Sequence, residues 1–67
     1  MARYSFTIDI DDDPEYPGHT ATVTRDGLRI YRDRFDTIAE ATKRALFQIR
    51  ADKVDPVPEY AIRGYQR

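Results

Sequence analysis

Residues 20–31, TATVTRDGLRIY, predict the β-hairpin around which the rest of this chain is expected to fold. Its alternating, β-branched residues surround Asp26-Gly27, the dipeptide that favours a two-residue type I′ turn between antiparallel strands. Such a turn fixes the pairing of the strands, so we expect Val23 to lie opposite Ile30. The apolar face of this hairpin should then carry Ala21, Val23, Leu28 and Ile30, and the polar face Thr22, Thr24, Arg29 and Tyr31.

Another strand is expected before the hairpin. Residues 3–10 alternate between apolar and polar side chains, which is typical of a half-buried strand. Residues 11–18 are rich in acid, proline and glycine and predict a loop. Together with strands over residues 20–25 and 28–35, this order predicts a three-stranded antiparallel sheet.

A helix is expected after the sheet. Thr37 and Glu40 form a capping box, in which each side chain satisfies a free backbone donor at the start of a helix. One stripe at helical spacing should cover the apolar sheet face: Ile38, Thr42, Ala45 and Ile49, flanked by Ala41 and Leu46. The sequence therefore predicts an α+β domain of order β-β-β-α over residues 1–53. A proline-containing tail over residues 54–67 follows and could add a short edge strand.

The composition argues against catalysis and against bound cofactors. A chain of 67 residues has little apolar material beyond what its own core needs. The single histidine, His19, is expected in a loop without a nearby nucleophile, and cysteine is absent. Asp9, Asp11 and Asp13 have the spacing that opens a calcium-binding EF-hand loop. Pro14 and Thr20 stand where that loop needs glycine and glutamate, so we expect no metal, no cofactor and no enzyme activity.

The sequence also predicts a cytoplasmic protein. No apolar run approaches the roughly 18 residues of a membrane span. Residues 1–5 lack the apolar stretch of a signal peptide. The absence of cysteine is compatible with a reducing compartment. Because the sequence has no candidate membrane span, we expect no membrane partner.

Phe47 marks the first candidate binding surface. On the predicted helix it lies opposite the buried stripe, beside Lys43 and Arg44. A large aromatic side chain on a charged face favours a covering partner. The cover could be the tail, through Tyr60 or Ile62, a second copy of the chain in a homodimer, or a foreign protein.

The polar sheet face is the second candidate surface. A three-stranded sheet can enter the major groove of DNA and read it with arginine and hydroxyl side chains. The residues expected to contact nucleic acid are Thr22, Thr24, Arg25, Arg29, Tyr31 and Arg32. The strand order and residues 34–41 are similar to the arm-binding domains of phage-type tyrosine integrases. The acidic loop at residues 11–15 argues against DNA.

The chain resembles the HicB-like antitoxin domains over residues 3–59. The shared features are a Tyr- and Ile-rich first strand, an acidic loop, an Asp-Thr-x-x-Glu-Ala helix junction at residues 36–41, and a Pro-x-Pro element at residues 56–58. The resemblance implies binding to a small ribonuclease toxin and inhibition of it. The family's Pro-Gly-Cys segment and its DNA-binding domain have no counterpart here, so operator binding is not implied.

The leading prediction is an antitoxin-like, protein-binding regulatory or inhibitory module, with a homodimer as one option for its assembly. The alternative is a nucleic-acid-binding module that uses the polar sheet face. A third hypothesis is a phage or mobile-element inhibitor of a host machine, whose acidic loop would mimic phosphate charge.

Overall fold

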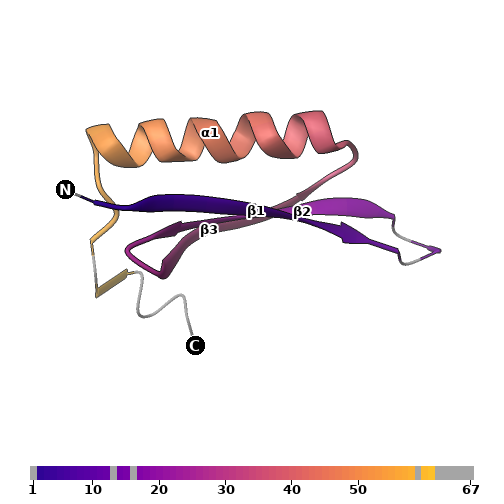
Figure 1. Cartoon of the computed structure of the whole chain (residues 1–67), viewed down its shortest axis with the longest axis horizontal. Helices are drawn as coiled ribbons and strands as arrows, with labels where there is room; N and C mark the ends of the chain where they lie inside the picture. Colours follow the sequence, from indigo (N-terminus) through magenta and orange to yellow (C-terminus); the bar gives the residue numbers. More distant parts are fainter. Residues whose placement is uncertain (1, 13, 16, 59, 62–67) are drawn as a thin grey trace.

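A computed structural model of the chain describes residues 2–12, 14, 15, 17–58, 60 and 61, and its fold is the α+β arrangement predicted from the sequence. The elements are β1 (Tyr4–Asp11), β2 (Gly18–Arg25), β3 (Leu28–Phe35) and α1 (Ile38–Val54). The three strands form one antiparallel sheet in the order β1-β2-β3, with β2 in the centre. The long helix lies across one face of this sheet, and none of the four elements named above covers the other face (Figure 1).

The hairpin between β2 and β3 closes as the Asp26-Gly27 dipeptide predicts. Both turn residues have positive φ, 53° at Asp26 and 83° at Gly27, as a type I′ turn requires. Beyond the turn, however, the register shifts between Val23 and Thr24. Val23 therefore lies opposite Tyr31 and not opposite Ile30, which corrects the predicted pairing.

The shift is a β-bulge that resolves a conflict in the β3 sequence. Regular alternation from the turn would point Arg32 and Arg34 toward the helix and turn Tyr31 and Phe35 to the outside. One extra residue, Ile30, reverses that assignment for the rest of the strand. Ile30, Tyr31 and Phe35 all pack against the core, and both arginines are exposed.

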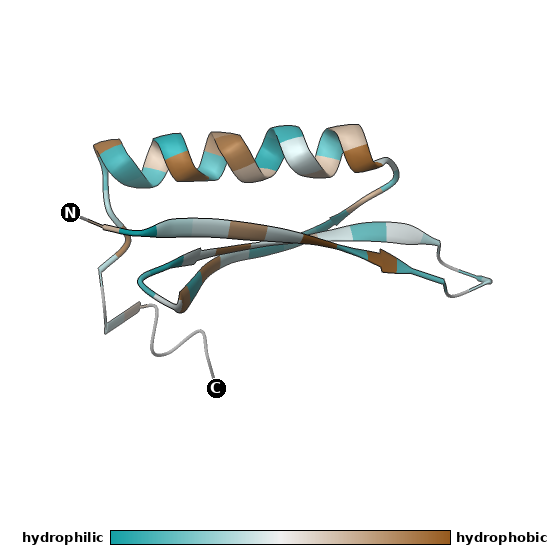
Figure 2. Cartoon of the chain, in the orientation of Figure 1, coloured by the Kyte–Doolittle hydropathy of each residue, from teal (hydrophilic) through white to brown (hydrophobic). Residues whose placement is uncertain are grey.

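The core between sheet and helix is thin. Its fully buried apolar side chains are small, namely Ala21, Val23, Ala41 and Ala45. Larger side chains are packed around them but only partly buried: Phe6, Ile8, Ile30, Tyr31, Phe35 and Ile49. Apolar residues are distributed over both layers (Figure 2), and several large ones are left at the surface: Ile10, Ile38, Leu46, Phe47, Val54 and Tyr60.

The buried stripe of α1 is rotated from the predicted one. Ala41 and Ala45 face the sheet as expected, with Asp52 completing the buried line. Ile38 and Leu46 are 55% and 47% exposed. The stripe is rotated because the small alanine side chains let the helix approach the sheet closely, whereas the bulkier side chains stand at the flank.

Candidate functional site

The outer face of α1 carries a shallow hollow around Phe47. The hollow is lined by Glu40, Lys43, Arg44 and Phe47, all from one helix. The Arg44 guanidinium lies 5.6 Å from the centroid of the Phe47 ring, a cation–π distance. Phe47 is nevertheless 56% exposed. The structure thus brings together the predicted helix residues of the protein-binding surface.

The described part of the tail does not cover Phe47. Tyr60, one of the two predicted covers, is 81% exposed. Ile62, the other, lies outside the described residues. The tail is held at Val57, where its N–H donates to Asp52 and its carbonyl accepts from Arg25. This attachment uses the C-terminal end of α1, while Phe47 stays open to another molecule.

Asp52 is the centre of a polar cluster that the sequence did not reveal. Its carboxylate accepts a 2.7 Å hydrogen bond from the Tyr4 hydroxyl, two hydrogen bonds from Arg25 Nη1 and one from the Val57 N–H. The Asp52 side chain is 2% exposed and that of Arg25 15%. The cluster therefore joins β1, β2, α1 and the start of the tail.

The pKa values of this cluster reflect its hydrogen bonds. Burial by itself raises the pKa of Asp52, but the bonds from Val57, Tyr4 and Arg25 outweigh it, so the pKa is lowered. Donation of the Tyr4 hydroxyl to Asp52, together with its desolvation, raises the pKa of Tyr4. The carboxylate and the neutral phenol are thus the favoured states, as expected for a structural cluster.

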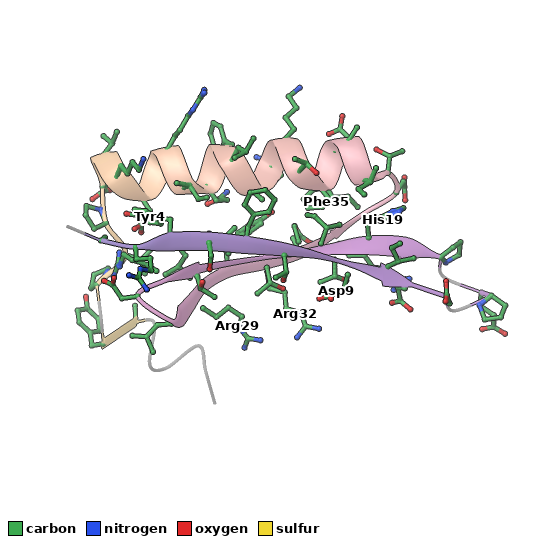
Figure 3. The ribbon with its side chains drawn as sticks, in the orientation of Figure 1. Tyr4, Asp9, His19, Arg29, Arg32 and Phe35 are labelled. Carbon is green, nitrogen blue, oxygen red and sulfur yellow. The ribbon has the colours of Figure 1, made fainter. Side chains whose placement is uncertain are left out.

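On the outer face of the sheet, each strand contributes one column of polar side chains. Cross-strand pairing sets the three columns side by side, which gives three rows, each listed from β1 to β3: Ser5, Thr24 and Arg29; Thr7, Thr22 and Arg32; Asp9, Thr20 and Arg34. Arg29, Arg32 and Asp9 point away from the helix (Figure 3). Ser5 Oγ and Thr24 Oγ1 lie 2.6 Å apart, and Arg34 pairs with Asp11 at 3.2 Å. The Arg32 guanidinium is exposed and forms no hydrogen bond or ion pair with the described residues.

Two residues of the predicted nucleic-acid-binding set do not lie on the outer face of the sheet. Thr22, Thr24 and Arg29 lie together on the outer face as expected, and the bulge adds Arg32 to them. Tyr31 faces the helix because the bulge moves it opposite the buried Val23. Arg25 also faces the helix, where it binds Asp52. Arg34 joins Arg29 and Arg32 along β3, and these three side chains form the arginine column of the outer face.

His19 lies in β2 and not in the preceding loop, because β2 begins at Gly18. It pairs with Ile10 and Phe35 and is half-buried (Figure 3). Its Nδ1 has no hydrogen-bond partner among the described residues.

Within the described chain, no group of three His, Asp or Glu residues could hold a metal ion. No described helix is long and apolar enough to cross a membrane.

Comparison of the chain with protein-family models, curated proteins and solved structures finds no match. The class of protein that the geometry defines is therefore a small α+β domain with two accessible side-chain surfaces, the α1 hollow and the outer sheet face. The resemblances to antitoxins and to integrase arm-binding domains stay predictions.

Proposed function

We propose that this chain is a non-enzymatic protein-binding module that engages its partner through the outer face of α1. The observation that carries the proposal is Phe47, a large aromatic side chain that is 56% exposed in a hollow shared with Lys43 and Arg44. Aromatic and arginine side chains at the centre of a patch are the residues that contribute most to protein–protein affinity.

The thin core supports the same proposal. The fully buried apolar set consists of three alanines and one valine, while Phe47, Leu46 and Ile38 are left about half exposed. An exposed apolar side chain that is covered only on binding contributes to affinity and not to folding. A domain with this distribution gains a large part of its apolar burial from association.

The charges around the hollow define the complementary partner. Lys43 and Arg44 flank the Phe47 ring, with Glu40 as the one acid in the lining. They would complement an apolar side chain bordered by carboxylates. The HicB-like resemblance suggests a small toxin for this role, with the chain as its cytoplasmic inhibitor.

Capture from the native lysate with matched variants tests the proposal. The wild-type chain is expected to retain a stoichiometric protein partner, and Phe47→Ala to lose it. Val54→Ala is the matched control, since Val54 is equally apolar, 86% exposed and outside the hollow. A partner bound equally by wild type and Phe47→Ala, or no stoichiometric partner at all, would overturn the proposal.

The arginine column favours a second candidate, a nucleic-acid-binding module. Arg29, Arg32 and Arg34 stand beside a column of threonines on one flat face, and such side chains contact phosphates. Titration of a labelled duplex against salt would test it. Arg32→Ala should lower the slope of log affinity against log salt by about one, whereas Lys43→Ala leaves it unchanged. No binding at about 50 mM salt would eliminate this candidate.

A further inference from the structure

β1 is an open edge with a regular line of backbone groups. Among the described elements it pairs with β2 alone. The Arg3 carbonyl accepts from the Asp26 N–H at 2.8 Å, which places Arg3 among the residues whose backbone groups point toward the hairpin. Because this direction alternates along a strand, the even-numbered residues of β1 direct their N–H and C=O groups to the open side.

The two edges of the sheet differ in how they discourage further pairing. β3 carries the bulge at Ile30 and charged residues at three consecutive positions, 32–34. Bulges and charges are the devices that protect a sheet edge. β1 pairs with β2 without any irregularity over its eight residues and contains no proline. It is therefore the edge that is competent to accept another strand.

An apolar flank of α1 overhangs this open edge. The Lys53 ammonium lies 5.7 Å from the centroid of the Tyr4 ring, so the flank of α1 that carries Lys53 faces β1. Leu46, seven residues earlier, shares that flank, and it is 47% exposed. At the other end of β1, Ile10 is 69% exposed. Edge and flank together form one side of the molecule that exposes two large apolar side chains, Ile10 and Leu46, and lacks a cover among the described residues.

We propose that this side binds a second copy of the chain, with β1 paired antiparallel to the partner's β1 about a two-fold axis at Thr7. In this register the apolar residues pair with each other, Tyr4 with Ile10 and Phe6 with Ile8. The polar residues of the outer face pair as Ser5 with Asp9 and Arg3 with Asp11. Each strand thus offers its own complement when reversed, which is what a two-fold interface requires.

The charges and the length of β1 together favour this register. Arg3 is the basic residue before β1, and Asp11 is the acidic residue at its end. A dyad at Phe6 also lets even-numbered residues exchange hydrogen bonds and places Arg3 opposite Asp9, but it pairs only residues 4–8 of the strand. A dyad at Ile8 leaves Arg3 opposite no residue of β1. The dyad at Thr7 pairs residues 4–10 and places opposite charges directly across the pair, which is stabilising.

The helices fit the same axis. Thr7 lies midway between Tyr4 and Ile10, and Leu46 lies midway along α1. α1 lies mainly over β2. The two β2 strands would be three strand spacings, or about 14 Å, apart, so the two helices would be separated by a similar distance. Helices in direct contact are about 8–10 Å apart. The additional space is filled by the flank side chains, with Leu46 of each copy closest to the axis.

This side of the molecule is separate from the proposed protein-binding surface. Figure 1 shows β1 at the near side, with α1 above it. Phe47 lies on the outer face of α1 and stays exposed in this arrangement. Failure of the dimer therefore leaves the Phe47 proposal standing, and the reverse also holds.

Cysteine cross-linking tests the axis directly, because the chain has no cysteine of its own. At Thr7 the two copies would form a non-hydrogen-bonded pair with Cα atoms about 4.5 Å apart, within the range for a disulfide. Thr7→Cys is expected to form a covalent dimer readily under mild oxidation. Ser5→Cys is the matched control: it is exposed on the same face, but its copies would be about 13 Å apart along the strand.

Charge reversal supplies the second measurement, by sedimentation equilibrium over a range of concentrations. Wild type is expected to self-associate as a dimer. Arg3→Asp and Asp11→Arg should each weaken association about tenfold, since each affects two symmetric pairs. The double variant should return to within about threefold of wild type. A monomeric wild type, equal cross-linking of Thr7→Cys and Ser5→Cys, or a double variant weaker than either single one would overturn the proposal.

Discussion

Tyr31 lies directly opposite Val23 in the sheet, one residue further along β3 than a regular hairpin closed by Asp26-Gly27 would place it. This relationship decides which face every later residue of β3 occupies. It brings Tyr31 and Phe35 to the core and Arg32 and Arg34 to the outer face. The outer sheet face depends on it, because it separates the arginine column from the helix-covered face.

The bulge makes a prediction about two adjacent residues. Tyr31→Ala removes a ring packed against the core and should lower the free energy of unfolding by about 2–3 kcal/mol. Arg32→Ala removes an exposed side chain and should change it by less than about 0.5 kcal/mol. Urea denaturation of both variants measures the difference. A regular register predicts the opposite order, so a larger loss for Arg32→Ala would exclude the bulge.

The Asp52 cluster predicts a stability centre far from either binding surface. Asp52→Asn removes the charge opposite Arg25 and should destabilise the domain by about 2–3 kcal/mol, less than a fully buried pair because Arg25 is partly solvated. Asp55→Asn, an exposed neighbour, is the control and should be nearly neutral. A loss below about 0.5 kcal/mol for Asp52→Asn would show that the cluster does not stabilise the fold.

The same cluster predicts how stability depends on pH. The pKa of Asp52 is lowered from an ordinary 3.8, so its contribution is complete above that value and is lost as the pH falls through the folded-state pKa. The pKa of Tyr4 is raised from 10.0, so its contribution is complete below 10.0 and is lost at higher pH. The stability difference between wild type and Asp52→Asn should therefore be constant near neutral pH and shrink at both extremes. A difference that grows below pH 3.8 would contradict this sign.

The helix cap makes a smaller prediction. Thr37 Oγ1 accepts the Glu40 N–H at 3.1 Å, as the capping box predicts. Thr37→Ala should cost about 1 kcal/mol, whereas Thr37→Ser should keep most of the stability. Thermal unfolding by circular dichroism measures both variants. Equal melting temperatures for the two would show that the hydroxyl does not contribute.

The features that the sequence predicted correctly are local. The Asp26-Gly27 turn, the Thr37 cap and the order of the elements each depend on a few neighbouring residues, so they could be recognised without knowledge of the fold. The bulge could have been recognised from the change of alternation at Ile30-Tyr31, where two apolar residues follow each other.

Asp52 offered no such local signal. Its partners Tyr4 and Arg25 are 48 and 27 residues away in the sequence. The helical pattern alone gave a charged residue at the end of an amphipathic helix, which is usually solvated. The two candidate surfaces differ in the same way. The residues of the α1 hollow lie together because helical spacing alone places them on one face. The residues of the outer sheet face depend on a strand register that the turn alone did not determine.

The proposed function requires that the outer face of α1, and not the outer face of the sheet, contacts the partner. Both faces can be probed by a photo-reactive phenylalanine analogue placed at position 43 or at position 32. Both positions are exposed, so the two probes are matched in accessibility.

Irradiation in the native lysate, followed by identification of the cross-linked species, is the most direct measurement. The proposal predicts a discrete protein adduct from position 43 and none from position 32. A protein or nucleic-acid adduct from position 32 alone, with none from position 43, would contradict it.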